Sequence, residues 1–163
     1  MRRLLIVWWS MTGGTQQLAE ALAEGAREEP GIEVVSLRAD EAAESDVLAA
    51  QAFVFATPEN LAAMAGRMKD FFDRTYYPVL GRIDGLGYAT LVCAGTDGMG
   101  AARQIARIAT GWRLKEIAPP LVLVNGAQTP EQILAPKRID PAQLARAREL
   151  GRTLGAGLAM GIW

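Results

Sequence analysis

The sequence predicts an α/β domain of three layers, in which a parallel sheet of five strands is covered by helices on both faces. Near-continuous apolar runs alternate with segments of helical periodicity along the whole chain, and no repeat, low-complexity tract or linker interrupts them. Continuous apolar runs are typical of strands buried on both faces, and right-handed crossovers through helices make such strands parallel. Five strands in 163 residues fit the doubly wound order 2-1-3-4-5, with residues 1–163 as a single domain.

The expected strands are five runs rich in Val, Ile, Leu or aromatic residues. They cover residues 3–9, 32–37, 52–56, 88–94 and 121–125. In an open sheet of this order, a ligand binds beyond the carboxyl ends of the strands, next to the first and third strands. The loops after these strands are therefore the expected functional loops.

Apolar residues at helical spacing predict five helices between and after the strands. The last one has a clear start, because Asp140 can cap it, Pro141 suits its first turn and Gln143 can complete a capping box. The short second helix is expected at residues 44–50. The inner faces of the other four are Leu18, Ala21, Leu22 and Ala26; Met64, Met68, Phe71, Phe72 and Thr75; Ala101, Ile105, Ile108 and Trp112; and Leu144, Ala147, Gly151, Leu154 and Leu158.

Composition excludes several classes of chemistry. Cys93 is the only cysteine and there is no histidine, which excludes disulfide frameworks, Cys/His zinc sites and histidine-based acid–base mechanisms. The formal net charge is −1 with the charges interspersed, and no apolar run approaches the roughly 20 residues of a membrane-spanning helix. We therefore expect a soluble, cytoplasmic protein with no nucleic-acid, membrane or metal partner. If it is an enzyme, a cofactor supplies the reactive group.

The stretch SMTGGTQ, between the first strand and the first helix, predicts a phosphate site. Backbone N–H groups at a helix N-terminus are unpaired and carry the positive end of the helix dipole, so they can bind phosphate without lysine or arginine. Hydroxyl groups add donors, and glycines allow a close approach. The alternative is a polar turn in which Thr15 only caps the helix. Walker, Rossmann and phospho-receiver patterns are absent. The candidate residues are Ser10, Met11, Thr12, Gly13, Gly14 and Thr15.

The pattern Ser-x-Thr-Gly-x-Thr after the first strand resembles the FMN phosphate loop of the flavodoxin superfamily. Two further stretches at the expected strand ends agree with this resemblance. The sequence TPENL followed by AAMAGRMKDFFDRTYYP is similar to the flavin-contacting loop and helix of FMN-dependent NAD(P)H:quinone oxidoreductases and NAD(P)H-dependent FMN reductases. The sequence CAGTDGMGA, after the fourth strand, stands where that superfamily has its second flavin loop. The resemblance covers nearly the whole chain.

The resemblance implies FMN as the cofactor, with one loop along each edge of the isoalloxazine ring. Backbone N–H and C=O groups would meet the polar edge of the ring, and glycines would permit unusual backbone angles in the second loop. The alternative is that both loops are ordinary connections, with Asp97 as a helix cap. The implied residues are Thr57, Pro58, Glu59, Asn60 and Leu61 in the first loop, and Gly95, Thr96, Asp97 and Gly98 in the second.

The resemblance further implies an oxidoreductase that accepts hydride from NADH or NADPH and passes electrons to a quinone or similar acceptor. No catalytic side chain is expected, because hydride transfer to flavin N5 needs no acid or base. Neither flavin loop contains Trp or Tyr and the net charge is near zero, which favours two-electron exchange. The alternatives are a flavodoxin-type electron carrier and a flavodoxin-like interaction module that binds no flavin. Related quinone reductases assemble as dimers or tetramers, which makes a homodimer a further prediction.

Overall fold

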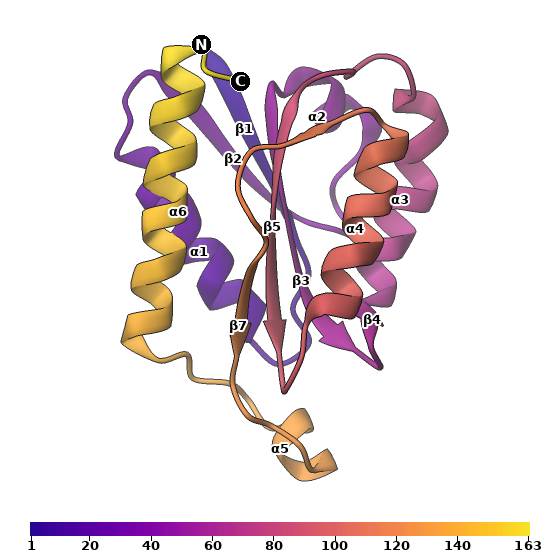
Figure 1. Ribbon diagram of the computed structural model, residues 1–163, viewed down its shortest axis with the longest axis vertical. Helices are drawn as coiled ribbons and strands as arrows, with labels where there is room; N and C mark the ends of the chain where they lie inside the picture. The colour runs from indigo at the N-terminus through magenta and orange to yellow at the C-terminus, as the bar shows by residue number, and fades with distance from the viewer.

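A computed structural model describes residues 1–163 and shows a twisted sheet between two layers of helices (Figure 1). Five strands form its core in the order β2-β1-β3-β5-β7, and each neighbouring pair is parallel. This confirms the predicted fold class and strand order. The core strands are β1 (Arg2–Trp8), β2 (Ile32–Arg38), β3 (Ala52–Asn60), β5 (Gly87–Ala94) and β7 (Leu121–Val124).

The sheet also contains two short strands that the sequence did not predict. β6 (Lys115–Glu116) pairs with the start of β5, on the edge along which β7 pairs with the end of β5. β4 (Ala63–Met64) pairs antiparallel with the end of β3, because β3 continues to Asn60 instead of ending at residue 56. Residues 57–60 are therefore part of a strand and not of a loop, which corrects the prediction.

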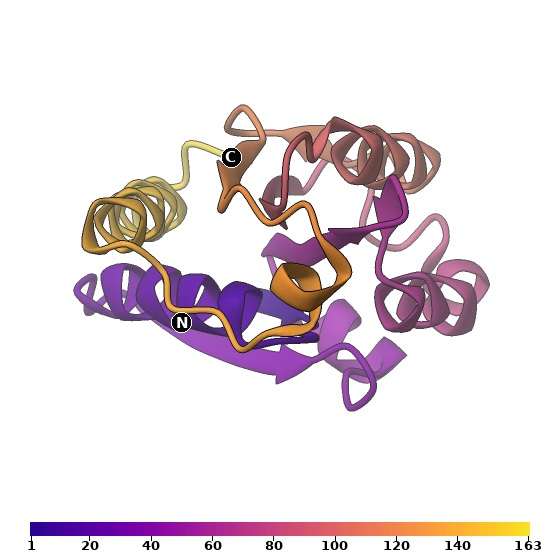
Figure 2. The same cartoon turned by 90° about the horizontal axis from the view of Figure 1, so that it is seen from below.

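Helices cover both faces of the sheet, and one short helix lies at its end. Figures 1 and 2 show α1 and α6 on one face, α3 and α4 on the other, and α5 beyond the carboxyl ends of the strands. None of the helices has the length and hydropathy that a membrane crossing requires. The helices are α1 (Gly14–Arg27), α2 (Glu44–Ala49), α3 (Gly66–Val79), α4 (Met99–Gly111), α5 (Pro130–Leu134) and α6 (Pro141–Met160).

The start of α3 differs from its prediction, and α6 starts as predicted but without its capping box. Met64 lies in β4 and not in α3, because its N–H donates to Gln104 Oε1 at 2.8 Å, and this holds the chain extended until α3 begins at Gly66. At the start of α6, Asp140 accepts a hydrogen bond from the Ala142 N–H at 2.7 Å, as a cap does. The predicted capping box is wrong, since the Gln143 side chain instead donates to the Val124 carbonyl at 2.9 Å.

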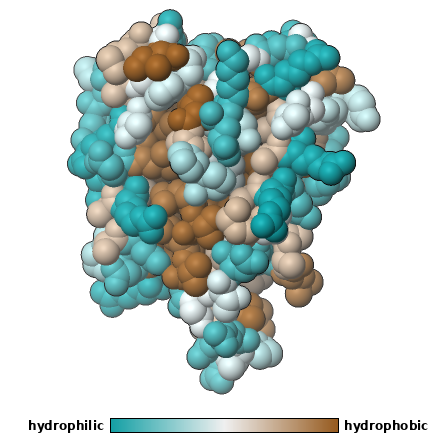
Figure 3. Space-filling model, viewed as in Figure 1, coloured by the Kyte–Doolittle hydropathy of each residue, from teal (hydrophilic) through white to brown (hydrophobic).

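Each face of the sheet has its own hydrophobic core, which explains the continuous apolar runs of the strands. Alternate residues of β1 point to opposite faces: Leu5 joins the aromatic core under α3 and α4, and Leu4 joins the aliphatic core under α1 and α6. Figure 3 shows hydrophobic surface along the β7 edge, between the α6 and α4 layers, where Leu121 and Val122 are half-buried. The cores hold the strand ends, and hence the loops after them, in fixed positions.

Candidate functional site

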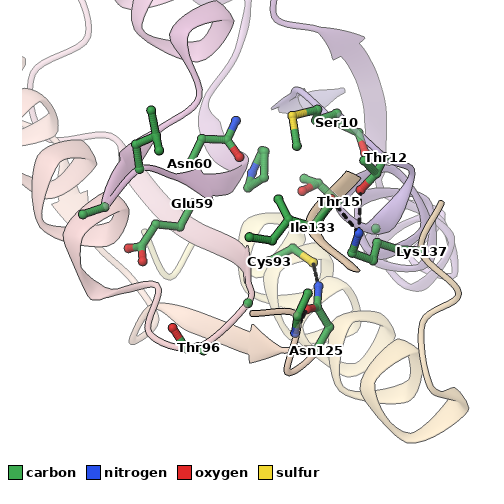
Figure 4. Close-up of a pocket in the computed structure, with 17 residues that line it drawn as sticks. Ser10, Thr12, Thr15, Glu59, Asn60, Cys93, Thr96, Asn125, Ile133 and Lys137 are labelled. Atoms are coloured by element: carbon green, nitrogen blue, oxygen red, sulfur yellow. Dashed lines mark hydrogen bonds between the residues drawn. The ribbon is translucent and has the colours of Figure 1, made fainter. Parts of the chain in front are cut away.

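A cavity of about 540 Å³ lies at the carboxyl ends of β1, β3 and β5, a size typical of small-molecule and cofactor sites (Figure 4). It brings the three predicted loops together, and a fourth segment, the chain after β7, completes its wall. Of the predicted residues, Gly13, Thr57, Asp97 and Gly98 do not line it. The lining residues are Ser10, Met11, Thr12, Gly14, Thr15, Pro58, Glu59, Asn60, Leu61, Ala62, Cys93, Gly95, Thr96, Asn125, Ala127, Ile133 and Lys137.

The loop from Ser10 to Thr15, which follows β1, presents free backbone donors to this cavity. Ser10 Oγ accepts a hydrogen bond from the Gly13 N–H at 3.0 Å, which folds the loop back, and Gly13 has a φ of 95° as the N-cap of α1. The first bond of α1 runs from the Gln17 N–H to the Gly13 carbonyl, at 3.2 Å. The N–H groups of Gly14, Thr15 and Gln16 come before it and have no acceptor within the helix. These donors suit an anion.

Thr15 does not cap the helix, so the capping role that the alternative interpretation gave it is wrong. It lies within α1, and its side chain makes no cap hydrogen bond. Thr15 is only 1% exposed, yet its hydroxyl has no hydrogen-bond partner. Buried polar groups are nearly always paired, so an orphaned hydroxyl in a cavity wall points to a ligand oxygen. Together with the free N–H groups, this hydroxyl fits a phosphate monoester such as that of FMN.

The side chains of two residues predicted to contact the flavin hold the β3–β4 hairpin in place. The Glu59 carboxylate accepts hydrogen bonds from the Gly98 N–H at 2.9 Å and the Ala101 N–H at 3.1 Å, and so ties the hairpin to the positive end of the α4 dipole. The buried Thr57 hydroxyl donates to the Pro58 carbonyl at 2.9 Å and accepts from the Ala65 N–H at 3.0 Å. These hydrogen bonds fix the position of the hairpin, and the Gly98 N–H is already paired with Glu59.

The tip of this hairpin is a two-residue turn with strained backbone. Leu61 and Ala62 have φ values of 51° and 62°, a region that glycine and asparagine normally occupy in such turns. Non-glycine residues pay roughly 1–2 kcal/mol each for this conformation. Leu61 is fully exposed, while both residues line the cavity. Strain of this kind concentrates at binding sites, where the backbone must present a defined edge.

Only the first half of the predicted loop after β5, Gly95 to Gly98, lines the cavity. Gly95 and Thr96 line it, and a Cβ at Gly95 would collide with the Ala127 carbonyl oxygen, so the loop and the chain after β7 pack closely. Asp97 comes one residue before the N-cap of α4, so it is not the cap that the alternative interpretation predicted, although its carboxylate accepts from the Met99 N–H at 3.2 Å. Gly98 is the N-cap of α4, with a φ of 92°.

Sequence reasoning missed the chain after β7 as part of the site. Thr129 and Gln132 form a capping box at α5, with the Thr129 hydroxyl accepting from the Gln132 N–H at 3.2 Å. The pattern Thr-Pro-x-Gln is a readable signal for such a start, so α5 could have been found. The cavity residues missed are Ala62, Cys93, Asn125, Ala127, Ile133 and Lys137.

The Cys93 thiol is an inert part of the cavity wall. It is 6% exposed and accepts a long hydrogen bond from Asn125 Nδ2 at 3.9 Å. Burial raises the pKa of the Cys93 thiol, and the Asn125 hydrogen bond and the Lys137 charge oppose this shift with smaller effects. The thiol is therefore protonated at neutral pH, and a nucleophilic role does not follow from its position.

The comparisons with known proteins agree with this geometry. The flavodoxin family model matches residues 6–111. Over 108 residues the chain is 35% identical to a flavodoxin of Aquifex aeolicus, covering 65% of this chain and 56% of that protein. Over 96 residues it is 35% identical to an NAD(P)H dehydrogenase (quinone) of Geobacter sulfurreducens, covering 44% and 47% of the two chains. The chain thus spans about half the length of the curated relatives it matches.

The fold is also that of a solved flavodoxin. A flavodoxin structure from the domain Archaea superposes with a TM-score of 0.79 at 18% identity, covering 96% of this chain and 98% of that one. The family model includes the end of the first strand, the loop from Ser10 to Thr15 and the segments after β3 and β5. This match extends over more than half of the residues, and the chain belongs to the flavodoxin family.

Proposed function

We propose that this protein is an FMN-dependent oxidoreductase that takes a hydride from NADH or NADPH and passes electrons to a quinone or similar flat acceptor. The observation that carries the proposal is the buried, unpartnered Thr15 hydroxyl beside the free N–H groups of α1, in a cavity large enough for a flavin. When bound, FMN would supply the redox chemistry of the site. The protein would bind and orient it.

Each part of the cavity would have its own task. The loop from Ser10 to Thr15 would hold the phosphate through N–H groups and hydroxyls. The hairpin tip at Asn60 to Ala62 would offer backbone groups to the polar edge of the ring, with Glu59 fixing the hairpin against α4. Gly95 and Thr96 would border the opposite edge. No side-chain acid or base is required, so we assign no catalytic residue.

The character of the cavity wall supports a two-electron enzyme over a one-electron carrier. No aromatic side chain lines the cavity, and Met11, Leu61 and Ile133 stand partly or fully exposed around it. Aliphatic side chains would leave room for a nicotinamide or a quinone ring to lie against the flavin. The relative named NAD(P)H dehydrogenase (quinone) adds support. A homodimer remains a prediction within this proposal.

Anaerobic reduction of the FMN-loaded protein tests the proposal. Excess NADH or NADPH should bleach the absorbance of oxidised flavin, and a soluble quinone should restore it. The same FMN with heat-unfolded protein corrects for the reaction of free flavin. If neither nucleotide bleaches the flavin but a flavodoxin reductase does, the protein is an electron carrier, the function that the name of the Aquifex aeolicus relative suggests. A protein that binds no FMN would be an interaction module.

A further inference from the structure

We propose that Lys137 is the cation of the phosphate site, and that it positions the Thr12 hydroxyl toward the phosphate monoester. The inference rests on the proposed function, because it takes that monoester to be the phosphate of FMN. Lys137 is the only basic residue that lines the cavity. The phosphate loop itself has no cationic side chain, so Lys137 would supply the single positive charge next to the dianion.

Lys137 belongs to residues 125–139, here called the strap, which joins β7 to α6. The strap passes over the carboxyl ends of the strands and carries α5 (Figure 2). Two hydrogen bonds join Lys137 to Thr12: its backbone N–H donates to the Thr12 carbonyl at 2.8 Å, and its Nζ donates to Thr12 Oγ1 at 3.3 Å (Figure 4). The lysine therefore lies directly against the phosphate loop.

Gln17 fixes the position of Lys137 from the other side. Its Nε2 donates to the carbonyls of Gly13, at 2.9 Å, and Lys137, at 2.8 Å. Its Oε1 accepts from the Ile139 N–H at 3.1 Å. One side chain of α1 thus bonds both the phosphate loop and the strap, so the backbone that carries Lys137 is held next to the loop before any ligand binds.

The ammonium group also makes the end of α5 compatible with an anion. Nζ lies within hydrogen-bond distance of three carbonyl oxygens at this end, those of Gln132 at 2.8 Å, Ile133 at 2.9 Å and Ala135 at 2.6 Å, and it shares its three protons among these oxygens and Thr12 Oγ1. Carbonyls at a helix C-terminus carry partial negative charge, which would repel a nearby phosphate. Lys137 offsets this charge at the cavity wall.

The hydrogen bond from Lys137 Nζ to Thr12 Oγ1 also orients the Thr12 hydroxyl proton. A hydroxyl has one proton to donate and two lone pairs that accept. Because Thr12 Oγ1 accepts from Lys137, its own proton remains free to donate to a phosphate oxygen. Riboflavin has no phosphate, so both effects of Lys137 apply to FMN alone.

Titration of FMN and riboflavin into the Lys137→Gln variant tests the inference by flavin fluorescence. FMN affinity should fall at least about tenfold, because the phosphate dianion loses the one cation that lines the cavity, while riboflavin affinity should stay within about twofold. Added salt should weaken FMN binding less in the variant than in the wild type. Lys115→Gln, which removes the same charge from β6 at the far end of β5, should match the wild type.

A second variant separates the charge from the integrity of the strap. Thr129→Ala removes the side-chain cap of α5 and leaves Lys137 in place. Three results would each overturn the inference. Lys137→Gln could bind FMN as tightly as the wild type, or lose FMN and riboflavin affinity equally. Thr129→Ala could lose as much FMN affinity as Lys137→Gln.

Failure of the proposed function gives a different result. If the wild type binds neither flavin, inorganic phosphate replaces FMN as the probe and the melting temperature as the readout. Phosphate should then stabilise the wild type and Lys115→Gln more than Lys137→Gln. Equal phosphate stabilisation in all three proteins, or none in the wild type, would overturn the assignment of Lys137.

Discussion

Thr15 carries an unsatisfied hydroxyl that is unfavourable without a ligand. A buried hydroxyl with no partner loses its hydrogen bonds to water and gains nothing in return. Thr15→Val keeps the shape of the side chain and removes this group, so we expect the free energy of unfolding without FMN to rise by about 1 kcal/mol. FMN affinity should fall about tenfold, as when one hydrogen bond to a charged group is lost. Urea unfolding and FMN titration measure the two effects.

Thr75 offers a matched control for Thr15. It is also 1% exposed and lies in a helix, but its hydroxyl donates to the Phe71 carbonyl at 2.7 Å. Thr75→Val should therefore not stabilise the protein, and FMN affinity should not change. A Thr15→Val protein that is less stable than the wild type, or that binds FMN equally well, would show that the Thr15 hydroxyl does not bind a ligand.

At the scale of elements, α1 and α6 pack backbone against backbone. A Cβ at Gly151 would collide with the Leu22 carbonyl oxygen, and one at Gly25 with the Arg148 carbonyl oxygen. Gly151→Ala should lower the free energy of unfolding by about 1–3 kcal/mol, because overpacking outweighs the better helix propensity of alanine. Gly66→Ala is the control, since a Cβ there meets no atom within 4 Å. Equal urea midpoints for the two variants would contradict this account of the helix contact.

Ion pairs at the α1–α6 contact contribute less than the glycines. Arg148 pairs with Glu24 at 2.6 Å and Arg152 with Glu28 at 2.7 Å, and all four side chains are at least one-third exposed. The Arg152 hydrogen bond holds the pKa of the Glu28 carboxyl below its usual value. Exposed pairs of this kind are screened by water and salt, so they align the two helices more than they stabilise them.

The sequence predicted the elements whose residue pattern follows from burial on both faces. It did not predict features that depend on pairing with residues distant in the chain. The five core strands were readable because both their faces are buried. The extension of β3 was not, since Pro, Glu and Asn are poor strand formers, and pairing with β4 and the end of β5 overrides that preference. Lys137 meets Thr12 across 125 positions of the chain, which no periodicity reveals.

At the scale of the whole molecule, the two cores hold one sheet, and the site is built from the segments at the carboxyl ends of its strands. The loop from Ser10 to Thr15, the hairpin tip, the end of β5 and the strap come from distant parts of the chain and meet at one edge of the sheet (Figures 1 and 2). The cavity therefore exists only in the folded chain. A ligand that fills it binds the native state alone, and binding must stabilise that state.

The central claim is that this cavity binds FMN, and urea unfolding with and without FMN tests it most directly. At an FMN concentration 100 times the dissociation constant, the free energy of unfolding should rise by about 2.7 kcal/mol. The wild-type unfolding curve should shift to higher urea as FMN increases. Unfolding curves that coincide at every FMN concentration would contradict the claim.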